Sequence, residues 1–252
     1  MHSTLRDYFE SLVVTVILAL FGTTFIVQAF KIPTPSMEDN LLVGDHLLVN
    51  KFVFGNVGSA WRWILPSREI RRGDVIVFKY PEDLTKHYVK RAIGLPGDRI
   101  KIVNQKLSIN GKIFEEPYIF HKMPEYRNVL VRDIFPLSRE LVNRLSGYQQ
   151  NRDIFDSYLF YRPFLQGDEI VIPPGQYFAM GDNRDNSADS RYWGFVPRKN
   201  IVGRALIIYW SYETDPNEHM RNTAADRLYQ YADMIINFLR KTRWSRSFML
   251  IS

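Results

Sequence analysis

The 252-residue chain is 46% hydrophobic and 24% charged, a composition that predicts a folded globular protein of one or two domains. Its 33 basic and 27 acidic residues give a net charge of +6, which suits an anionic lipid surface or nucleic acid. No dense Lys/Arg tract and no recognisable nucleic-acid-binding module is present, so we expect no nucleic-acid partner. The absence of cysteine excludes disulfides, thiolate metal sites and a cysteine nucleophile.

Residues 12–30, LVVTVILALFGTTFIVQAF, contain no charged side chain. At about 1.5 Å per residue a helix of this length matches the roughly 30 Å hydrocarbon core of a bilayer. A buried soluble helix is disfavoured because the stretch is apolar on nearly every face, and a cleaved signal peptide because Gln28-Ala29-Phe30-Lys31 is a poor cleavage site. The sequence therefore predicts a transmembrane helix at 12–30 after an N-terminal tail at 1–11. Arg6 and Lys31 flank it almost symmetrically, which leaves its orientation open.

After residue 31 the chain is rich in short runs of β-branched and aromatic residues, which are typical of strands. Asn110-Gly111 lies between two such runs and predicts a hairpin with a type I′ turn, since both residues tolerate positive φ. The predicted strands are at 46–54, 74–80, 99–103, 106–114, 168–175, 176–180 and 201–210. The fold class is therefore mainly β, with a main domain at 31–114 and 168–252.

Two regions differ from this pattern. Residues 115–167 are polar and mixed, with a helix-like piece around 137–145, and predict an inserted smaller α/β region. Residues 223–241 carry apolar side chains at helical spacing, which favours a helix that packs on the core. A helix on a membrane surface stays open as the alternative, because the basic residues Arg240, Lys241, Arg243 and Arg246 follow.

The chemistry-bearing residues exclude several common site types. The five histidines have no metal-ligand spacing, and 182–190 lacks both the central glycine and the closing glutamate of a calcium loop. We therefore expect no metal and no cofactor. Ser36, in IPTPSM, is a candidate nucleophile, and without a suitable histidine its base would be a lysine whose pKa is lowered by apolar surroundings. Lys90, in KHYVKRAIG, has such neighbours, although most lysines in strands are exposed.

Five segments of the chain stand out by their order and spacing. They are IPTPSM (32–37), LLVGDHLLVNKF (41–52), RRGDVIVFKYPED (71–83), YVKRAIGLPGD (88–98) and GDNRDNSADSRYWGFVP (181–197). In this order and spacing they resemble bacterial type I signal peptidases. The resemblance covers roughly residues 12–112 and 168–210, and more faintly RWSR at 243–246. It implies a Ser/Lys endopeptidase with an antiparallel β-sheet catalytic domain that removes signal peptides from exported preproteins.

The resemblance also implies roles for single residues. Ser36 would be the nucleophile and Lys90 the general base, while the Thr34 hydroxyl and the Ser36 N–H would form the oxyanion hole. Ser187 would orient the lysine, and an ion pair would support its loop. That pair consists of Asp189 and Arg191. Five further residues would line the pockets that accept the small side chains of an Ala-x-Ala substrate, namely Ile32, Met37, Leu41, Tyr88 and Val89. The chain departs from the family at Asp39, where many members have proline, and at Thr34, which replaces the commoner serine.

The implied partners are signal peptides emerging from the translocation machinery, together with membrane lipid. Because the scissile bond of a translocated preprotein emerges at the outer face, we expect a single-pass protein of the cell (inner) membrane with a cytoplasmic tail and an extracytoplasmic catalytic domain. An inactive membrane-tethered peptide binder and a self-cleaving repressor-type Ser/Lys protease are the alternatives. The second would need a DNA-binding domain and no membrane segment.

Overall fold

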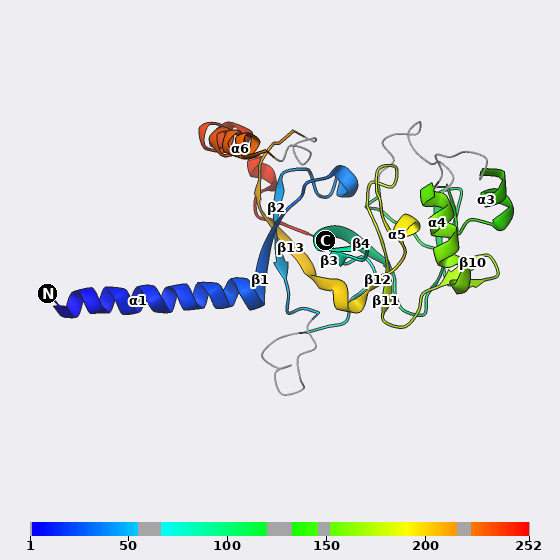
Figure 1. Cartoon of the computed structure of the whole chain (residues 1–252), viewed down its shortest axis with the longest axis horizontal. Helices are drawn as coiled ribbons and strands as arrows, with labels where there is room; N and C mark the ends of the chain where they lie inside the picture. Colours follow the sequence, from blue (N-terminus) through cyan, green and yellow to red (C-terminus); the bar gives the residue numbers. More distant parts are fainter. Residues whose placement is uncertain (1, 55–66, 120–132, 146–151, 216–222, 252) are drawn as a thin grey trace.

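A computed structural model of the chain describes residues 2–54, 67–119, 133–145, 152–215 and 223–251. One long helix, α1 (His2–Phe21), extends away from a body of two β-sheets, with a second helix, α6 (Ala224–Ile236), at the edge of the body (Figure 1). All strand pairs are antiparallel, as the sequence predicts.

The N-terminal segment differs from the predicted helix at 12–30. Helix α1 ends at Phe21, a π-helical turn covers Gly22–Ile26, and β1 (Val27–Lys31) is already a strand. Residues 27–31 pair in continuous register with 46–50, and these ladder hydrogen bonds replace the helical ones. The prediction of a helix through Phe30 is therefore wrong at its C-terminal end. Among the described residues, no helix combines the length and the apolar character needed to cross a bilayer.

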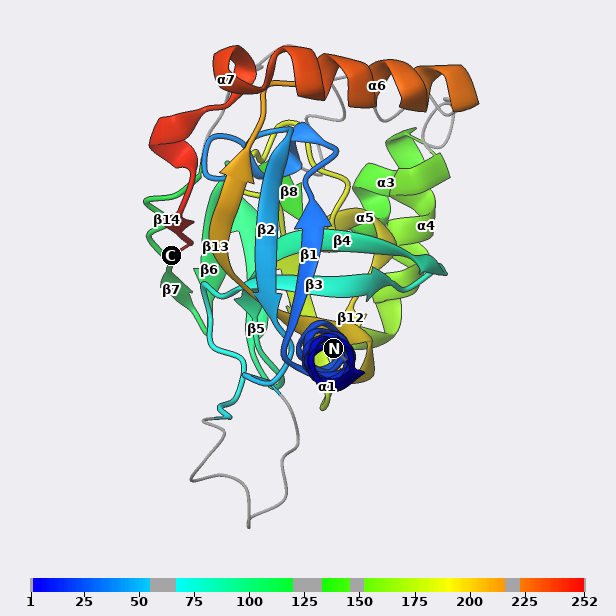
Figure 2. The same ribbon diagram turned by 90° about the vertical axis from the view of Figure 1, so that its left-hand side faces the viewer.

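The larger sheet has the order β1-β2-β13-β3-β4-β11-β12, with β14 paired to β13. In Figure 2, β1, β2 and β13 run vertically while β3 and β4 cross the view, so the sheet is strongly twisted. Its other strands are β2 (Asp45–Asn50), β3 (Val75–Tyr80), β4 (Asp83–Gly94), β11 (Gln176–Met180), β12 (Val196–Pro197), β13 (Ile201–Ser211) and β14 (Met249–Leu250).

The smaller sheet has the order β7-β6-β5-β10-β9, with β8 paired to β5. The predicted type I′ turn is confirmed, because Asn110 and Gly111 have φ values of 53° and 76° between β6 and β7. The strands are β5 (Arg99–Val103), β6 (Lys106–Ile109), β7 (Lys112–Ile113), β8 (Ile134–Phe135), β9 (Leu165–Gln166) and β10 (Glu169–Val171).

The described part of the inserted region packs on this smaller sheet. Its helices are α3 (Arg139–Leu145) and α4 (Arg152–Tyr161), followed by a 3-10 turn at Arg162–Phe164. Val142, Ile154 and Tyr161 share one buried cluster with Ile100 and Ile170 of β5 and β10. The insertion thus extends an existing core. Residues 120–132 and 146–151 of the predicted insertion lie outside the described residues.

Two further buried clusters lie on the larger sheet. Val75 and Val77 of β3 belong to one, whereas Ile76 and Phe78 belong to the other. Because successive side chains of a strand point to opposite faces, both faces of this sheet are covered. Such double burial fits the nearly continuous apolar run at 75–78.

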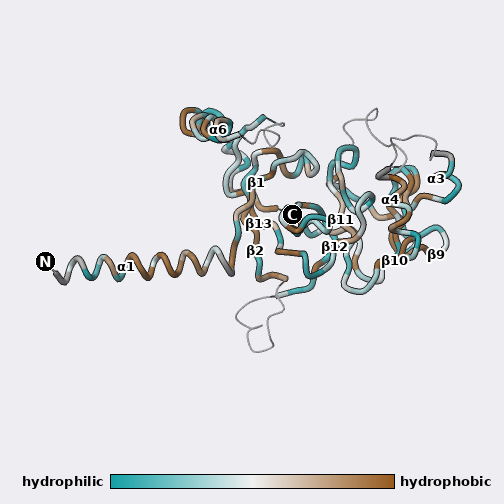
Figure 3. The backbone as a smooth tube through the Cα atoms, in the orientation of Figure 1, coloured by the Kyte–Doolittle hydropathy of each residue, from teal (hydrophilic) through white to brown (hydrophobic). Residues whose placement is uncertain are grey.

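The C-terminal helix forms where the sequence predicts it, but its orientation contradicts the favoured packing. Helix α6 is followed by α7 (Phe238–Lys241), and a capping box of Thr223 and Asp226 starts it. Leu228, Ile235 and Leu239, which were expected to pack on the core, are exposed. Hydrogen bonds from the Tyr212 hydroxyl and Lys241 to Asp233 turn the polar side of the helix toward the domain instead. In Figure 3, brown segments of α6 lie toward the side to which α1 extends.

Candidate active site

Ser36 and Lys90, 54 residues apart in sequence, meet in a buried contact. Ser36 lies in the 3-10 turn Pro35–Met37 after β1, and Lys90 lies in the middle of β4. Lys90 Nζ donates a hydrogen bond of 2.6 Å to Ser36 Oγ and a second one of 3.1 Å to the Val89 carbonyl oxygen. Their exposed fractions are 7% for Ser36 and 4% for Lys90, so water is largely excluded from the pair.

The segment before Ser36 is held extended by its prolines and by the neighbouring strand. Thr34 has φ −132° and ψ 153°, the extended geometry that a following proline favours, and Pro35 begins the 3-10 turn. Ile32 donates its N–H to the Asp45 carbonyl oxygen (2.8 Å) and accepts from the Gly44 N–H (3.0 Å). The sequence thus places the serine at a sharp exit from β1.

The loop at 181–187 covers the same turn from the other side. The Asn183 N–H donates to the Ser36 carbonyl oxygen at 3.2 Å, and the Asn183 amide donates to the Pro35 carbonyl oxygen at 3.2 Å. Gly181 permits this approach, because a Cβ there would collide with the Ser36 carbonyl oxygen and with the Ser187 side chain. Asn183 and Gly181 belong to the segment 181–197 that resembles the family. Their role in holding the Ser36 turn is visible only in these contacts.

The surroundings of Lys90 favour its neutral form. The pKa of its amine is lowered from the ordinary 10.5 to about 8. Burial is the main cause, Asp189 and Asp182 oppose it, and Arg191 adds a smaller lowering effect. The Tyr88 ring lies beside the amine, with its centroid 5.7 Å from Nζ. A lysine in this environment releases its proton far more readily than one in water.

The residues expected to support Lys90 all follow β11, and Arg191 belongs to the short helix α5 (Ser190–Trp193), which Asp189 caps. Arg191 donates to both oxygens of Asp189, at 2.9 and 2.8 Å, in a buried ion pair. Burial raises the pKa of the Asp189 carboxyl, but the charge and hydrogen bonds of Arg191 outweigh it, so this pKa lies below its usual range. Ser187 Oγ is buried and makes no hydrogen bond to Lys90 in the described part of the chain, so the orienting bond that the resemblance implies is not formed.

The five expected pocket residues divide between the two faces of the larger sheet. Ile32, Met37 and Leu41 are buried in one cluster, with Val89 packed against it. Tyr88 packs with the other cluster and stacks on Tyr80, with ring centroids 4.6 Å apart. The first four residues therefore form a single apolar layer next to the serine, and Tyr88 flanks the lysine.

Next to the dyad lies a buried ion pair that sequence reasoning missed. Arg91 donates to both oxygens of Asp182, at 2.9 and 2.8 Å, and Asn40 adds a hydrogen bond of 2.8 Å to the same carboxylate. The Arg91 guanidinium also lies 4.0 Å from the Tyr118 ring centroid. This network ties β4, the serine loop and the loop at 181–187 together. The sequence gives one indication of this pair, which is that Arg91 directly follows Lys90 and Asp182 directly follows Gly181 in the segments that resemble the family.

Removal of one partner of this pair should destabilise the fold strongly. We expect Asp182→Ala to lower the free energy of unfolding by about 3–5 kcal/mol, because it leaves the Arg91 charge buried without its partner. The matched control is Asp168→Ala, which breaks an exposed pair with Lys101 and should leave stability nearly unchanged. Urea denaturation of both variants measures the difference, and equal effects would contradict the importance of the buried pair.

The faint match at 243–246 also lies close to the serine loop. Arg246 donates to Asp45 at 2.7 Å, and Arg243 Nη2 lies 3.7 Å from the same carboxylate. Ser211 Oγ donates to it at 2.6 Å. Asp45 opens β2 and fixes the loop that follows Met37, so the end of the chain braces the turn that carries Ser36.

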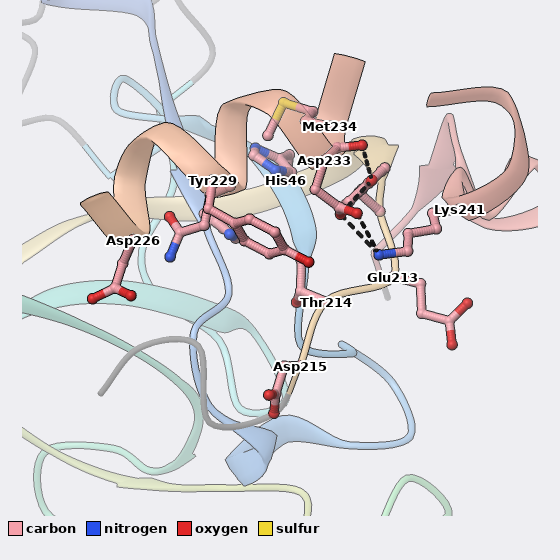
Figure 4. Close-up of a pocket in the computed structure, with 12 residues that line it drawn as sticks. His46, Glu213, Thr214, Asp215, Asp226, Tyr229, Asp233, Met234 and Lys241 are labelled. Atoms are coloured by element: carbon pink, nitrogen blue, oxygen red, sulfur yellow. Dashed lines mark hydrogen bonds and ion pairs between the residues drawn. The ribbon is translucent and has the colours of Figure 1, made fainter. Parts of the chain in front are cut away.

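A pocket of about 220 Å³ lies elsewhere, between α6 and the edge of the larger sheet. Figure 4 shows Asp233 bonded to Lys241 on one side of it, with Tyr229 and His46 nearby. None of the dyad residues lines it. No group of three or more His, Asp or Glu side chains that could hold a metal ion occurs in the described residues.

Comparisons with known proteins give a family. The family model described as "Signal peptidase, peptidase S26" matches residues 5–210. The signal peptidase I of Aquifex aeolicus is 37% identical over 228 residues, which cover 82% of this chain and 85% of the relative. That of Pseudomonas aeruginosa is 34% identical over 232 residues, covering 86% and 76%. A crystal structure of a signal peptidase I from Enterococcus faecalis matches at 26% identity and a TM-score of 0.33, over 54% of this chain and 97% of that one. The chain therefore belongs to the signal peptidase family, peptidase S26, and is a serine endopeptidase.

Proposed function

We propose that the protein is a membrane-anchored signal peptidase that cleaves preproteins after small residues with a Ser36/Lys90 dyad. The observation that carries this proposal is the 2.6 Å contact between Lys90 Nζ and Ser36 Oγ inside a site that excludes water. The test is cleavage of a full-length preprotein by the purified enzyme, with the N-terminus of the product sequenced. An enzyme that binds the preprotein without cleaving it would support the inactive binder instead.

The reaction is acyl transfer to serine followed by hydrolysis. Neutral Lys90 takes the Ser36 hydroxyl proton while Oγ attacks the scissile carbonyl carbon, forming a tetrahedral oxyanion. Collapse breaks the C–N bond, and protonated Lys90 gives its proton to the leaving amine. A water molecule then loses a proton to Lys90 and attacks the Ser36 ester. Collapse of this second intermediate breaks the bond between the carbonyl carbon and Oγ, and protonated Lys90 returns its proton to Oγ. This releases the new carboxyl end and regenerates the serine, and no metal or cofactor takes part.

Thr34 and the Ser36 N–H are the donors that we assign to the oxyanion. Neither the Thr34 hydroxyl nor the Ser36 N–H makes a hydrogen bond within the described residues, so both are available to a substrate. Both belong to the extended segment and turn that the two prolines fix, which means they are oriented before the substrate binds.

Loss of the Thr34 hydroxyl should slow the chemical step. We expect Thr34→Val, which keeps the shape of the side chain, to lower kcat by about 10²–10³-fold with little change in KM. Thr34→Ser restores the donor and should keep most of the activity. Steady-state kinetics on a signal-peptide substrate decide the matter, and full activity in Thr34→Val would remove this residue from the oxyanion hole.

The substrate preference follows from the apolar layer beside the serine. Ile32, Met37 and Leu41 are almost completely buried and already in contact with one another, so they leave little depth for a substrate side chain. We therefore propose Ala-x-Ala sequences before the scissile bond. Replacing either alanine of a test substrate by leucine should abolish cleavage at that bond, and tolerance of leucine at both positions would contradict the proposal.

The surface of α1 supports a membrane location. All large apolar side chains from Tyr8 to Phe21 are exposed on a helix that stands clear of the body (Figure 1). We propose that α1 anchors the protein as a single-pass protein of the cell membrane, with the β domain on the extracytoplasmic side, where preproteins leave the translocation machinery. Because the chain has no cysteine, the Lys112→Cys variant should react with a membrane-impermeant maleimide on intact cells. Reaction only after lysis would reverse the orientation.

A further inference from the structure

Helix α6 contacts the domain with its polar side and exposes its apolar side, which is unfavourable in water. The Tyr212 hydroxyl, Lys241 and the capping residue Asn237 all donate hydrogen bonds to Asp233, which lies on the side toward the domain. Leu228, Ile235 and Ile236 of α6 and Leu239 of the following α7 take no part in these contacts and are 71%, 79%, 79% and 75% exposed. Surface helices of soluble domains have the reverse arrangement, with the apolar stripe turned toward the core.

The exposed apolar stripe, defined as these four residues, lies between Arg227 and Arg240 in the sequence. Residues 223–250 contain five basic and two acidic residues, a net charge of +3. Arg227 and Arg240 are exposed and form no ion pair within the described residues, whereas both acids are engaged in the cap and in the Asp233 network. Unpaired arginines next to exposed apolar side chains are typical of helices that lie on anionic lipid.

The direction of α6 relative to α1 also suits contact with a lipid surface. Figure 1 shows α1 lengthwise and α6 nearly end-on, and Figure 2, turned by 90°, shows the reverse. The two helices thus run crosswise, and α6 lies on the side of the body from which α1 departs. If α1 is inserted along the bilayer normal, α6 lies parallel to the membrane surface with its stripe outward from the domain. This step rests on the membrane anchor proposed above.

We propose that α6 together with α7 is an interfacial helical segment, which buries the stripe of Leu228, Ile235, Ile236 and Leu239 in the headgroup region of an anionic membrane. Arg227 and Arg240 contact lipid phosphates at its ends. Trp244, which packs edge-on against Phe238 and is exposed, extends this contact with an aromatic side chain of the kind found at membrane interfaces. Together, α1 and α6 would hold the β domain in one orientation, because a single anchor leaves it free to rotate.

The absence of cysteine in the chain makes a direct test possible. The full chain carrying Ile235→Cys is labelled with an environment-sensitive nitrobenzoxadiazole dye and reconstituted into vesicles of phosphatidylcholine and phosphatidylglycerol. Lys112→Cys, at an exposed hairpin of the smaller sheet, is the matched control. We expect a shift of emission to shorter wavelength and quenching by doxyl-labelled lipid at residue 235, and neither effect at residue 112. The shift should shrink in pure phosphatidylcholine and in the Arg227→Gln/Arg240→Gln background.

Each other outcome counts against the proposal in a distinguishable way. A label at residue 235 that stays as water-exposed as the one at residue 112, in vesicles where the enzyme still cleaves a preprotein, overturns the lipid contact and leaves the proposed function intact. Disulfide-linked dimers of unlabelled Ile235→Cys, with no lipid quenching, would show that a second copy of the chain covers the stripe. Lipid quenching without any preprotein cleavage would support the interfacial helix while the proposed function fails.

Discussion

Replacing Ser36 by alanine or Lys90 by methionine should each lower preprotein cleavage by at least about 10³-fold. Ser36→Ala removes the attacking oxygen, and Lys90→Met keeps the length of the side chain but removes the amine that is in hydrogen-bond contact with that oxygen. Because the two groups act as a unit, the double variant should be no slower than either single variant. Cleavage of a labelled preprotein, followed over time, measures all three.

Matched controls separate loss of chemistry from loss of structure. Ser108→Ala and Lys101→Met change the same residue types in the smaller sheet, on β6 and β5, and should keep wild-type rates. Near-wild-type unfolding transitions of Ser36→Ala and Lys90→Met would show that the fold is preserved. Substantial cleavage by Lys90→Met would contradict the role of Lys90 as the general base. A residue of the neighbouring loop at 181–187 would then have to act as the base.

The contact between Ser36 and Lys90 was expected from the family resemblance of the two segments that carry them, and each residue also has characteristic neighbours. Pro33 and Pro35 pin the serine, and Val89 and Ala92 flank the lysine with apolar side chains. The Asn110-Gly111 turn was equally readable, since it depends on two adjacent residues that accept positive φ. Local features of this kind require no knowledge of the tertiary contacts.

The features that sequence reasoning missed depend on contacts between distant segments. Arg91 and Asp182 are 91 residues apart, and nothing in either segment states that they pair. Val27–Lys31 is apolar enough to continue a helix, but β2 offers it a complete hydrogen-bonding ladder. The periodicity of α6 predicted one apolar side without saying which way that side points. Asp233 decides this through Tyr212, just after β13, and Lys241 of α7.

The activity should depend steeply on pH, because only neutral Lys90 can accept the Ser36 proton. With a pKa of about 8, the neutral fraction falls roughly tenfold for each pH unit below 8 and is about one hundredth at pH 6. We expect kcat/KM to fall with this slope on acidification and to level off above pH 8. Initial rates between pH 5 and 10 on a substrate without titrating groups check this, and a rate that is flat down to pH 5 would rule out Lys90 as the base.

The stability of the fold gives an independent measure of the same pKa. The pKa of Lys90 is about 8 in the folded state and 10.5 in the unfolded chain. Between pH 8 and pH 10.5 the unfolded chain therefore binds more protons at Lys90 than the folded one, so the free energy of unfolding rises with pH in this range. Above 10.5 the amine is neutral in both states and the penalty disappears, whereas below 8 it is fully present and costs roughly 3 kcal/mol. Wild-type protein should therefore lose about this much stability relative to Lys90→Met as the pH falls from 10.5 to 8. Since other groups titrate alike in both proteins, their difference isolates Lys90, and a difference that does not change with pH would show that the buried amine keeps its ordinary pKa.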